Sequence, residues 1–533
     1  MTESAASPRL APETLFDLLR VHLAHEGGDR PLLVTTERSY SSRDVDEASA
    51  RLAAWLLHVG VKPGDRVVVD LKNGVEAVVS LFAVARVGGV TVCATPQWSI
   101  AQLSHLIADA GAEVLITSDV RARQLRDARP AEVLTVGGVS EGATPWSAVE
   151  GAGAPSTLPE LAPPAAEDPA VLIYTSGTTG LPKGVVHPHK NLVDFARIVS
   201  SYLGNTADDR LLWVLGWSFG YGMSQLLTMC QVGGRLILPE SMLAADVVKA
   251  HELHRATGLA QVPYGWDQLL GFLERTGRHL EGLRYVTNAG DGPTLDLLDR
   301  LEARLAGTPI ILMYGQTECF RTTYLPSDRY ADKRGAMGYA IPEVEVHVLR
   351  EDGTLAEPGE PGELVHGGAL LSPGYFHAPE ATARKFRPSE ALGRPEPVLH
   401  TGDIVRRDAD GCLWYVARSE RMIKSSGFRF GPGEIEAAAR SVPGVHEAVA
   451  FGVHDANLGQ AVELAVSLAL DDASEREQLV RALELALKQR LPRYMLPRHV
   501  LVIDAMPRTA TNKIDLPSLQ ALALREAGEA PAG

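Results

Sequence analysis

The hydrophobic positions near the start of the chain recur with the period of a helix. They are Val45, Ala48, Leu52 and Leu56. Ser41 and Ser42 precede this apolar face and Gly60 follows it. A serine in that place caps a helix, and a glycine commonly ends one. We therefore predict a helix that is capped by Ser41 or Ser42 and ends before Gly60.

Other apolar runs are short and lack this period, which is typical of buried strands. They cover residues 66–71, 91–93, 170–173, 210–215, 283–290, 308–315 and 344–349, and a longer apolar stretch at 75–89 is predicted to be a helix. Strands that alternate with helices predict parallel sheets covered by helices, so we expect an α/β fold. Residues 138–168, rich in Ala, Pro and Gly, are predicted to form a surface connection, and the tail 525–533 to be disordered.

Length and charge narrow the possible functions. The chain has 533 residues and a net charge of −15. The length predicts roughly three to four domain-sized units. An acidic balance without a basic block argues against nucleic acid as a partner. The cysteines form no C-x-x-C pair, so we predict reduced thiols in the core rather than disulfides or a zinc site. They are Cys93, Cys230, Cys319 and Cys412.

Targeting and membrane signals are not found in the sequence. The first residues show no basic segment followed by an apolar core, as a signal peptide would. No apolar run approaches the ~18 residues that a membrane span needs. We therefore expect a cytoplasmic protein that does not bind a membrane.

The most informative polar stretch is YTSGTTGLPKG, which directly follows the apolar run 170–173. Glycine lets the backbone approach a ligand, hydroxyl and backbone N–H groups donate to phosphate oxygens, and Lys183 adds a cation. The nucleotide-hydrolase pattern G-x-x-x-x-G-K-[ST] is not met, because Pro182 precedes the lysine and Gly184 follows it. Such clusters are most often plain turns, but the preceding strand and the lysine favour a phosphate-binding loop.

Four further polar stretches follow the same logic. They are YGQTE (314–318), HTGD (400–403), RSERMIKSSGFRFGPGEIE (418–436) and PRTATNKID (507–515). The first follows an apolar strand, where α/β sheets bind ligands, and the second holds a carboxylate that suits ribose hydroxyls. Singly, each has a plain interpretation: Asp403 as a turn residue, Glu318 as a helix-start residue, Lys513 as a surface cation. Their joint presence in this order favours function.

With these motifs the whole chain resembles the ANL superfamily of adenylate-forming enzymes. The stretches LGWSFGYG (215–222) and SSGFRFGPGEIE look most like the acetyl-, medium-chain- and aryl-CoA synthetases. The resemblance implies a large N-terminal domain of helix-covered sheets (1–419) and a small, mobile α+β C-terminal domain (420–533) with a hinge at Glu420. It implies an acyl-CoA ligase, which uses Mg-ATP to turn a carboxylic acid into acyl-AMP and then passes the acyl group to CoA.

The resemblance also implies the residues that bind ATP and Mg²⁺. The β- and γ-phosphates would be held by Thr175, Ser176, Gly177, Thr178, Thr179, Gly180 and Lys183. Thr317 would hydrogen-bond the α-phosphate, and Glu318 would hold Mg²⁺. Tyr314 would stack on adenine, and Asp403 would bind the ribose hydroxyls. The rest of the implied nucleotide set is Gly290, Asp291, Gly292, Gly315, Gln316, Arg418 and Arg429.

Two lysines are implied to serve the two half-reactions. Lys513 would bridge the attacking carboxylate and the α-phosphate during adenylation. After the C-terminal domain rotates, Lys424 would face the active site instead. Thr317 and Glu318 complete the implied catalytic set with these lysines. The tunnel for the pantetheine arm of CoA would be lined by Ser425, Ser426, Gly427 and Phe428.

The acyl pocket is implied to lie beside YGQTE and GWSFGYG. Its implied lining is Trp217, Phe219, Tyr221, Gly222, Tyr264 and Gly315. Acetate-specific relatives carry Trp at the position of Gly315 and close the pocket with it. Glycine here predicts an open pocket and a large apolar acid, which is aryl, medium-chain or polycyclic. Any single one of these aromatic residues is about as readily explained as part of the core.

Two positions depart from the family pattern, and they leave alternatives open. The hinge is usually Asp or Lys and is Glu420 here, and the residue before the terminal lysine is usually Gly and is Asn512 here. Asn restricts the loop that delivers Lys513, so one alternative is an enzyme competent mainly in making the thioester from acyl-AMP. Another is a ligase that loads a carrier protein. Intact Glu318, Asp403 and Lys513 disfavour a non-catalytic relative.

Overall fold

The computed structural model describes residues 12–125, 128–152, 162–175, 182–425, 428–455, 458–468, 473–508 and 514–526. The chain divides into two compact units. Unit 1 comprises Met1–His347, Val365–His400 and Gly411–Leu413, and unit 2 comprises Val348–Leu364, Thr401–Asp410 and Trp414–Gly533. Each unit is described by itself below.

Unit 1 contains a seven-stranded sheet that is parallel except for one edge. In sheet order its strands are β7 (Thr144–Pro145), β6 (Glu132–Val136), β5 (Val114–Ser118), β3 (Arg66–Asp70), β4 (Val90–Ala94), β8 (Pro169–Thr175) and β9 (Lys183–Pro188). The edge pair β8–β9 is antiparallel, with Thr175 opposite Lys183. The stretch YTSGTTGLPKG therefore joins two hydrogen-bonded strands, and its residues 176–181 lie outside the described residues.

Unit 1 also contains a nine-stranded sheet. In sheet order its strands are β16 (Tyr339–Ala340), β15 (Thr323–Leu325), β14 (Ile310–Tyr314), β13 (Tyr285–Asn288), β12 (Gly258–Gln261), β10 (Arg210–Leu212), β11 (Arg235–Ile237), β1 (Pro31–Val34) and β2 (Ser39–Ser41). The strands from β14 to β1 pair in parallel, so their carboxyl ends meet at one edge.

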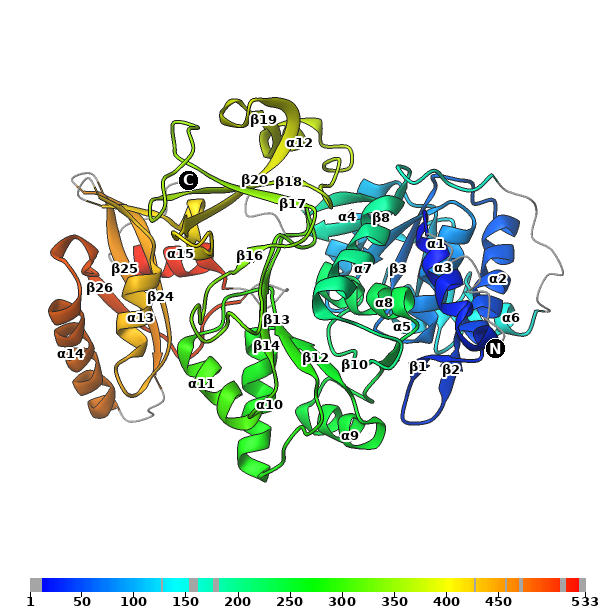
Figure 1. The fold of residues 1–533 in the computed structure, drawn as a ribbon, viewed down its shortest axis with the longest axis horizontal. Helices are drawn as coiled ribbons and strands as arrows, with labels where there is room; N and C mark the ends of the chain where they lie inside the picture. Colours follow the sequence, from blue (N-terminus) through cyan, green and yellow to red (C-terminus); the bar gives the residue numbers. More distant parts are fainter. Residues whose placement is uncertain are drawn as a thin grey trace, which may run out of the picture. The chain divides into compact units, whose positions relative to one another are not determined.

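Helices fill the space between the two sheets of unit 1 and cover their outer faces (Figure 1). The central helices are α1 (Leu15–Leu23), α2 (Ser42–His58), α3 (Val75–Arg86), α7 (His189–Leu203) and α8 (Gly220–Val232). The outer helices are α4 (Ile100–Ala110) and α5 (Asp119–Leu125) on the seven-stranded sheet, and α9 (Ala244–His254), α10 (Pro263–Thr276) and α11 (Leu295–Arg304) on the nine-stranded sheet. Side chains on the two faces of β3 belong to different cores. Val67 and Val69 lie in the core between the two sheets, and Val68 lies in the core under the outer helices α4 and α5.

The division into units assigns some residues of a third sheet to unit 1 and others to unit 2. A fourth sheet belongs entirely to unit 2. The third sheet consists of β17 (Val344–Leu349), β18 (Pro361–Gly368), β20 (Arg394–Arg407), β19 (Phe386–Ser389) and β21 (Leu413–Arg418). The fourth consists of β23 (Phe428–Phe430), β22 (Ile423–Ser425), β25 (Gly459–Leu468), β24 (Val445–Asp455) and β26 (His499–Val502). The remaining helices are α6 (Trp146–Glu150), α12 (Pro379–Lys385), α13 (Gly433–Arg440), α14 (Ala473–Arg490) and α15 (Leu516–Glu526).

The predicted α/β class, with helix-covered sheets, is confirmed. Ser41 is the residue that caps α2, in a capping box with Asp44. The expected surface connection at 138–168 is wrong in part, because β7 and α6 form there and Trp146 is buried in the core. Trp146 and Val149 of α6 both pack into the core and anchor this segment. Of the tail, Arg525 and Glu526 end α15, and the remainder lies outside the described residues.

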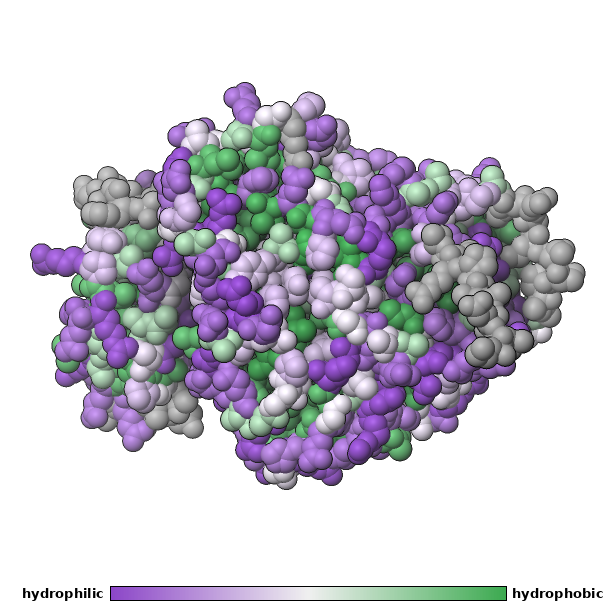
Figure 2. All heavy atoms as spheres, viewed as in Figure 1, coloured by the Kyte–Doolittle hydropathy of each residue, from purple (hydrophilic) through white to green (hydrophobic). Residues whose placement is uncertain are grey.

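The described helices include none that is long and apolar enough to cross a bilayer. Figure 2 shows hydrophilic side chains spread over the visible face, with hydrophobic atoms in smaller groups between them. All four cysteines are buried and none of them forms a disulfide, as predicted. Burial raises the pKa of Cys319 to about 11, so this thiol is protonated at neutral pH.

Candidate active site

The loop after β14 holds the stretch YGQTE in a tight turn. Phe320 adopts a left-handed backbone (φ 53°), and the Arg321 N–H donates to the carbonyl of Cys319 at 2.5 Å. The turn brings backbone so close to Gly315 that an added Cβ would lie 2.2 Å from the Phe320 carbonyl oxygen. Phe320 is itself fixed by stacking on His187, with ring centroids 3.9 Å apart. Burial lowers the pKa of His187 to about 3, so this stack contains a neutral imidazole.

This geometry corrects the interpretation of Gly315. The space beside its α-carbon is filled by the backbone of Phe320 and Arg321, so glycine is required for a close approach and does not open a pocket. We expect Gly315→Ala to lower the free energy of unfolding by about 3 kcal/mol, the upper end of the usual overpacking cost. Gly292→Ala is the control, because an added Cβ there meets nothing within 4 Å. Equal urea midpoints for the two variants would contradict the assignment.

Glu318 is tied to the base of the β8–β9 hairpin through Tyr375. The Tyr375 hydroxyl donates to Glu318 Oε1 at 2.6 Å. Tyr375 also forms a β-bridge with Val185, two residues after Lys183. The backbone of Glu318 is fixed as well, since its carbonyl accepts the Ser372 N–H at 2.9 Å. Within unit 1, Tyr375 therefore connects Glu318, the predicted Mg²⁺ ligand, to the hairpin that carries the predicted phosphate loop.

The loop after β13 lies next to YGQTE, because β13 and β14 are paired neighbours. Asn288 Nδ2 donates to the Asp291 carbonyl at 3.0 Å, and the Asp291 carboxylate accepts the Gly292 N–H at 2.8 Å. Gly290 has a positive φ of 89°, which glycine adopts without strain. Tyr314, which is predicted to stack on adenine, and the predicted nucleotide-binding residues 290–292 thus lie at the carboxyl ends of adjacent strands.

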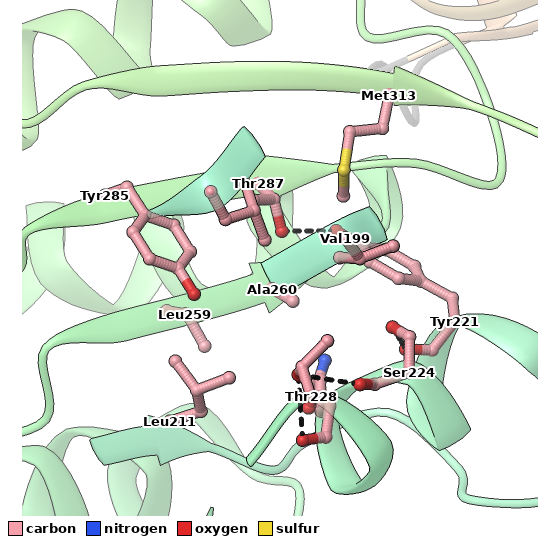
Figure 3. Close-up of a pocket in the computed structure, with 12 residues that line it drawn as sticks. Val199, Leu211, Tyr221, Ser224, Thr228, Leu259, Ala260, Tyr285, Thr287 and Met313 are labelled. Atoms are coloured by element: carbon pink, nitrogen blue, oxygen red, sulfur yellow. Dashed lines mark hydrogen bonds between the residues drawn. The ribbon is translucent and has the colours of Figure 1, made fainter. Parts of the chain in front are cut away.

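A small cavity lies below these loops, between α7, α8 and the nine-stranded sheet (Figure 3). It offers about 20 Å³ to the centre of a water-sized sphere. Its lining consists of Val199, Leu203, Leu211, Tyr221, Ser224, Gln225, Thr228, Leu259, Ala260, Tyr285, Thr287 and Met313. The Tyr221 hydroxyl meets Thr287 Oγ1 at 2.7 Å and joins the start of α8 to the end of β13. The strand residues Ala260, Thr287 and Met313 each stand one position before the end of their strand.

Only Tyr221 of the predicted acyl-pocket residues lines this cavity. Trp217 is buried in the core, where its indole N–H donates to the Leu71 carbonyl at 2.7 Å. Tyr264 is 54% exposed. Gly222 meets the Gly216 backbone so closely that an added Cβ would lie 2.0 Å from its carbonyl oxygen. Phe219 forms the N-cap of α8. Their place in an acyl pocket stays a prediction.

The predicted ribose-binding pair lies in unit 2. Asp403 is 1% exposed at its side chain, and its Oδ1 lies 2.8 Å from Arg418 Nε. The Asp403 N–H donates to Thr401 Oγ1 at 3.1 Å. Thr401 in turn donates to the Leu364 carbonyl at 2.6 Å, and Gly402 takes a positive φ of 74°. The pair sits in β20 and β21 rather than in a free loop.

Other predicted residues of the small domain are placed in part. Lys424 pairs with Arg429, and Ser425 with Phe428, across β22 and β23. Glu420 belongs to a short 3₁₀ turn before β22, and its role as a hinge stays a prediction. Ser426, Gly427, Asn512 and Lys513 lie outside the described residues, as do Ser176, Gly177, Thr178, Thr179 and Gly180.

The sequence interpretation missed Tyr375, Gln225 and Arg321. Tyr375 lies 57 positions after Glu318, and no motif links the two. Gln225 lies in α8, which begins within the stretch LGWSFGYG, but only the fold shows that this residue is buried. Arg321 lies three residues after Glu318 and is 2% exposed, which its position in the motif does not reveal.

Comparison with known proteins shows the family to which the chain belongs. The AMP-binding enzyme family model matches residues 20–376, and the AMP-binding enzyme C-terminal domain model matches residues 434–513. Phosphinothricin tripeptide synthetase PhsC of Streptomyces viridochromogenes is 32% identical over 95% of this chain, which spans 44% of that relative. The L-proline–[L-prolyl-carrier protein] ligase of Streptomyces coelicolor is 31% identical over 87% of this chain and 88% of its own.

Solved structures give the same result. The o-succinylbenzoate CoA synthetase of Bacillus subtilis with its acyl-adenylate intermediate aligns with a TM-score of 0.80 at 25% identity, over 94% of this chain and 97% of its own. The same enzyme with ATP and magnesium aligns with a TM-score of 0.80 at 26% identity, over 93% and 98% of the two chains. The chain belongs to the AMP-binding enzyme family of the ANL superfamily, whose members are adenylate-forming ligases.

Proposed function

We propose that the protein activates a carboxylic acid with ATP and transfers the acyl group to the thiol of CoA. The observation that carries the proposal is Glu318, held by Tyr375 at 2.6 Å beside the hairpin of the predicted phosphate loop. One carboxylate together with substrate phosphates is the way in which Mg²⁺ is commonly bound at such sites.

In the first step, a carboxylate oxygen of the acid attacks the α-phosphorus of ATP, and the bond to pyrophosphate breaks. Mg²⁺ would be held by Glu318 and would neutralise charge on the leaving phosphates. Thr317 would donate to the α-phosphate, and Lys183 would bind the phosphates beyond it. Lys513 would place its ammonium between carboxylate and phosphate, where negative charge builds up.

In the second step, the CoA sulfur attacks the acyl carbon and the bond from that carbon to AMP oxygen breaks. The thiol proton is released and AMP leaves. Asp403 and Arg418 would hold the ribose of the adenylate, and the β22–β23 strands with Lys424 and Ser425 would border the incoming arm. A hinge at Glu420 would let one small domain serve both steps in turn.

A carrier protein is the second candidate acceptor. Relatives such as the prolyl-carrier protein ligase support it, because their names state that acceptor. Among the described residues that line the cavity there is no Asp or Glu to pair with an ammonium group. The proposal therefore commits to an acid without a charged amine near the cavity.

A panel of acids with ATP tests the proposal, with pyrophosphate and acyl-CoA measured separately. We expect pyrophosphate release with at least one acid and formation of its CoA thioester. Thioester formation only with a phosphopantetheinylated carrier protein would favour the second candidate. Acyl transfer from supplied acyl-AMP but not from acid and ATP would favour an enzyme limited to the second half-reaction.

Tyr375→Phe should loosen Glu318 without changing the shape of the site. Removing a hydrogen bond to a charged group costs about 1.5 kcal/mol at the lower end, so we expect roughly tenfold weaker activation by Mg²⁺. The measurement is pyrophosphate release over a Mg²⁺ titration at fixed ATP. Tyr415→Phe is the control, since Tyr415 is 50% exposed in unit 2. The same Mg²⁺ response in both variants would show that Tyr375 does not position the metal ligand.

A further inference from the structure

The unexplained feature of the cavity is the amide of Gln225. This residue is 3% exposed, and both its Nε2 and its Oε1 are buried without a hydrogen-bond partner. It also lines the cavity. A buried polar atom without a partner costs about 1–3 kcal/mol, and such atoms are uncommon in native proteins. Gln225 therefore places an unsatisfied amide, with two N–H donors and one acceptor oxygen, in the wall of the cavity, where a bound group can satisfy it.

The hydroxyl groups around Gln225 are already engaged. Ser224 Oγ donates to the Tyr221 carbonyl at 2.8 Å, and Thr228 Oγ1 to the Ser224 carbonyl at 2.7 Å. Tyr285 accepts a hydrogen bond from Asn205 at 2.9 Å. Tyr221 and Thr287 bond to each other, as the dashed line in Figure 3 shows. None of these groups serves Gln225, so its amide is left for a ligand.

The size and position of the cavity restrict that ligand. Its free space of about 20 Å³ suits one water-sized group. A hydroxyl has that size, and it both donates to an amide oxygen and accepts from an amide nitrogen. The cavity lies just before the ends of β12, β13 and β14, below the loops that would hold the adenylate. A group bound there is remote from the reacting carboxylate.

Charge distinguishes a hydroxyl from an amine. Arg321 is 2% exposed, and its Cζ lies 5.0 Å from the ring centre of Tyr221. Among the described residues, no Asp or Glu forms an ion pair with it, and its Nε has no hydrogen-bond partner. Burial raises the pKa of Tyr202 to about 12, and the charge of Arg321 opposes that rise. A buried cation behind one wall of the cavity favours an electron-rich oxygen and repels an ammonium group.

We propose that the acid activated by this protein carries a hydroxyl group remote from its carboxylate, and that Gln225 recognises this hydroxyl inside the cavity. The inference rests on the proposed function and specifies its substrate class. Gln225 is thereby a specificity-determining residue. The apolar body of the acid would lie between the cavity and the carboxylate, so the earlier expectation of a wholly apolar acid is narrowed to one with a polar end.

Matched acids test this proposal. We would compare kcat/KM for acid-dependent pyrophosphate release with benzoate, 3-hydroxybenzoate, 4-hydroxybenzoate, octanoate and 8-hydroxyoctanoate. A site that binds a hydroxyl through buried polar groups rejects the analogue that lacks it, so we expect at least about a tenfold preference for one hydroxylated acid over its parent. We also expect 4-(aminomethyl)benzoate, whose amine is cationic, to be a worse substrate than 4-hydroxybenzoate.

Gln225→Leu should abolish the preference for the hydroxylated acid over its parent, because it removes the amide that binds the hydroxyl. Gln231→Leu, the same change on the same helix, should keep the preference, because Gln231 does not line the cavity. Gln225→Met serves as a second variant if the leucine variant unfolds. An unchanged preference for the hydroxylated acid in the Gln225 variants would overturn the proposal. It would indicate that a structural water, and not the substrate, binds the Gln225 amide.

The outcomes separate this inference from the proposed function. Activation of the parent acids with no preference for any hydroxylated partner overturns the inference alone. A preference for 4-(aminomethyl)benzoate over 4-hydroxybenzoate also overturns it. No acid-dependent pyrophosphate release with any acid of the panel contradicts the proposed function, and the inference falls with it.

Discussion

Replacing Lys513 by alanine is expected to slow formation of the acyl adenylate by about 10²–10³-fold, which is typical for loss of one electrostatic contact to a transition state. The attack of a carboxylate on the α-phosphate brings two anionic groups together, and the resemblance assigns to Lys513 the cation between them. Thioester formation from supplied acyl-AMP has no such requirement. We therefore expect that second rate to remain close to that of the unchanged protein.

The two rates are measured separately, one from acid with ATP and the other from synthetic acyl-AMP with CoA. Lys488→Ala is the control, because Lys488 is an exposed lysine of α14 in unit 2. An equal loss in both half-reactions of the Lys513 variant would contradict its assignment. The same assays on the unmodified protein show whether adenylation is the slower half-reaction, and their repetition with Asn512→Gly shows whether Asn512 is the cause.

Asp403→Ala is expected to lower kcat/KM for ATP by about 10²-fold. Two hydrogen bonds from ribose hydroxyls to a carboxylate contribute about 1.5 kcal/mol each at the lower end of the usual range. Asp403 is suited to this role because its carboxylate is 1% exposed and is oriented by Arg418. The loss should appear as a higher KM for ATP, with little change in the KM for the acid.

Stability distinguishes this role from a structural one. The Arg418 side chain is 42% exposed, so water can solvate its charge when the aspartate is removed. We therefore expect the melting temperature of Asp403→Ala to remain close to that of Asp410→Ala, a control at an exposed aspartate of unit 2. A large fall in melting temperature with an unchanged KM for ATP would show that the Asp403–Arg418 pair supports the fold alone.

The fold was largely predictable because local pattern decides it. The run 344–349 coincides with β17, and 308–315 contains β14. Strand ends were less well predicted where apolar residues continue past the last hydrogen bond. Residues 210–215 are one example, since β10 ends at Leu212 although Trp213 and Val214 are also buried. Hydrophobicity reports burial, and the hydrogen-bonded part of a buried run depends on its neighbours in the sheet.

The candidate site was predictable where one motif carries it and unpredictable where distant segments meet. The sequence interpretation selected Glu318 from YGQTE, but its partner Tyr375 comes from another segment. It also interpreted Gly315 as leaving room for a large acyl group, although the backbone of the turn at Phe320 fills that room. Gln225 is an ordinary helix residue in sequence, and only its burial without a partner makes it informative. Contacts across long separations and backbone conformation have no local signature of this kind.

The central claim is that this chain forms an acyl adenylate from a carboxylic acid and ATP. The most direct measurement is the exchange of labelled pyrophosphate into ATP, with and without an acid and in the absence of any thiol. We predict that exchange requires an acid and Mg²⁺, and that it proceeds without CoA or a carrier protein. ATP turnover that is independent of every acid tested, or no exchange with any of them, would contradict the account.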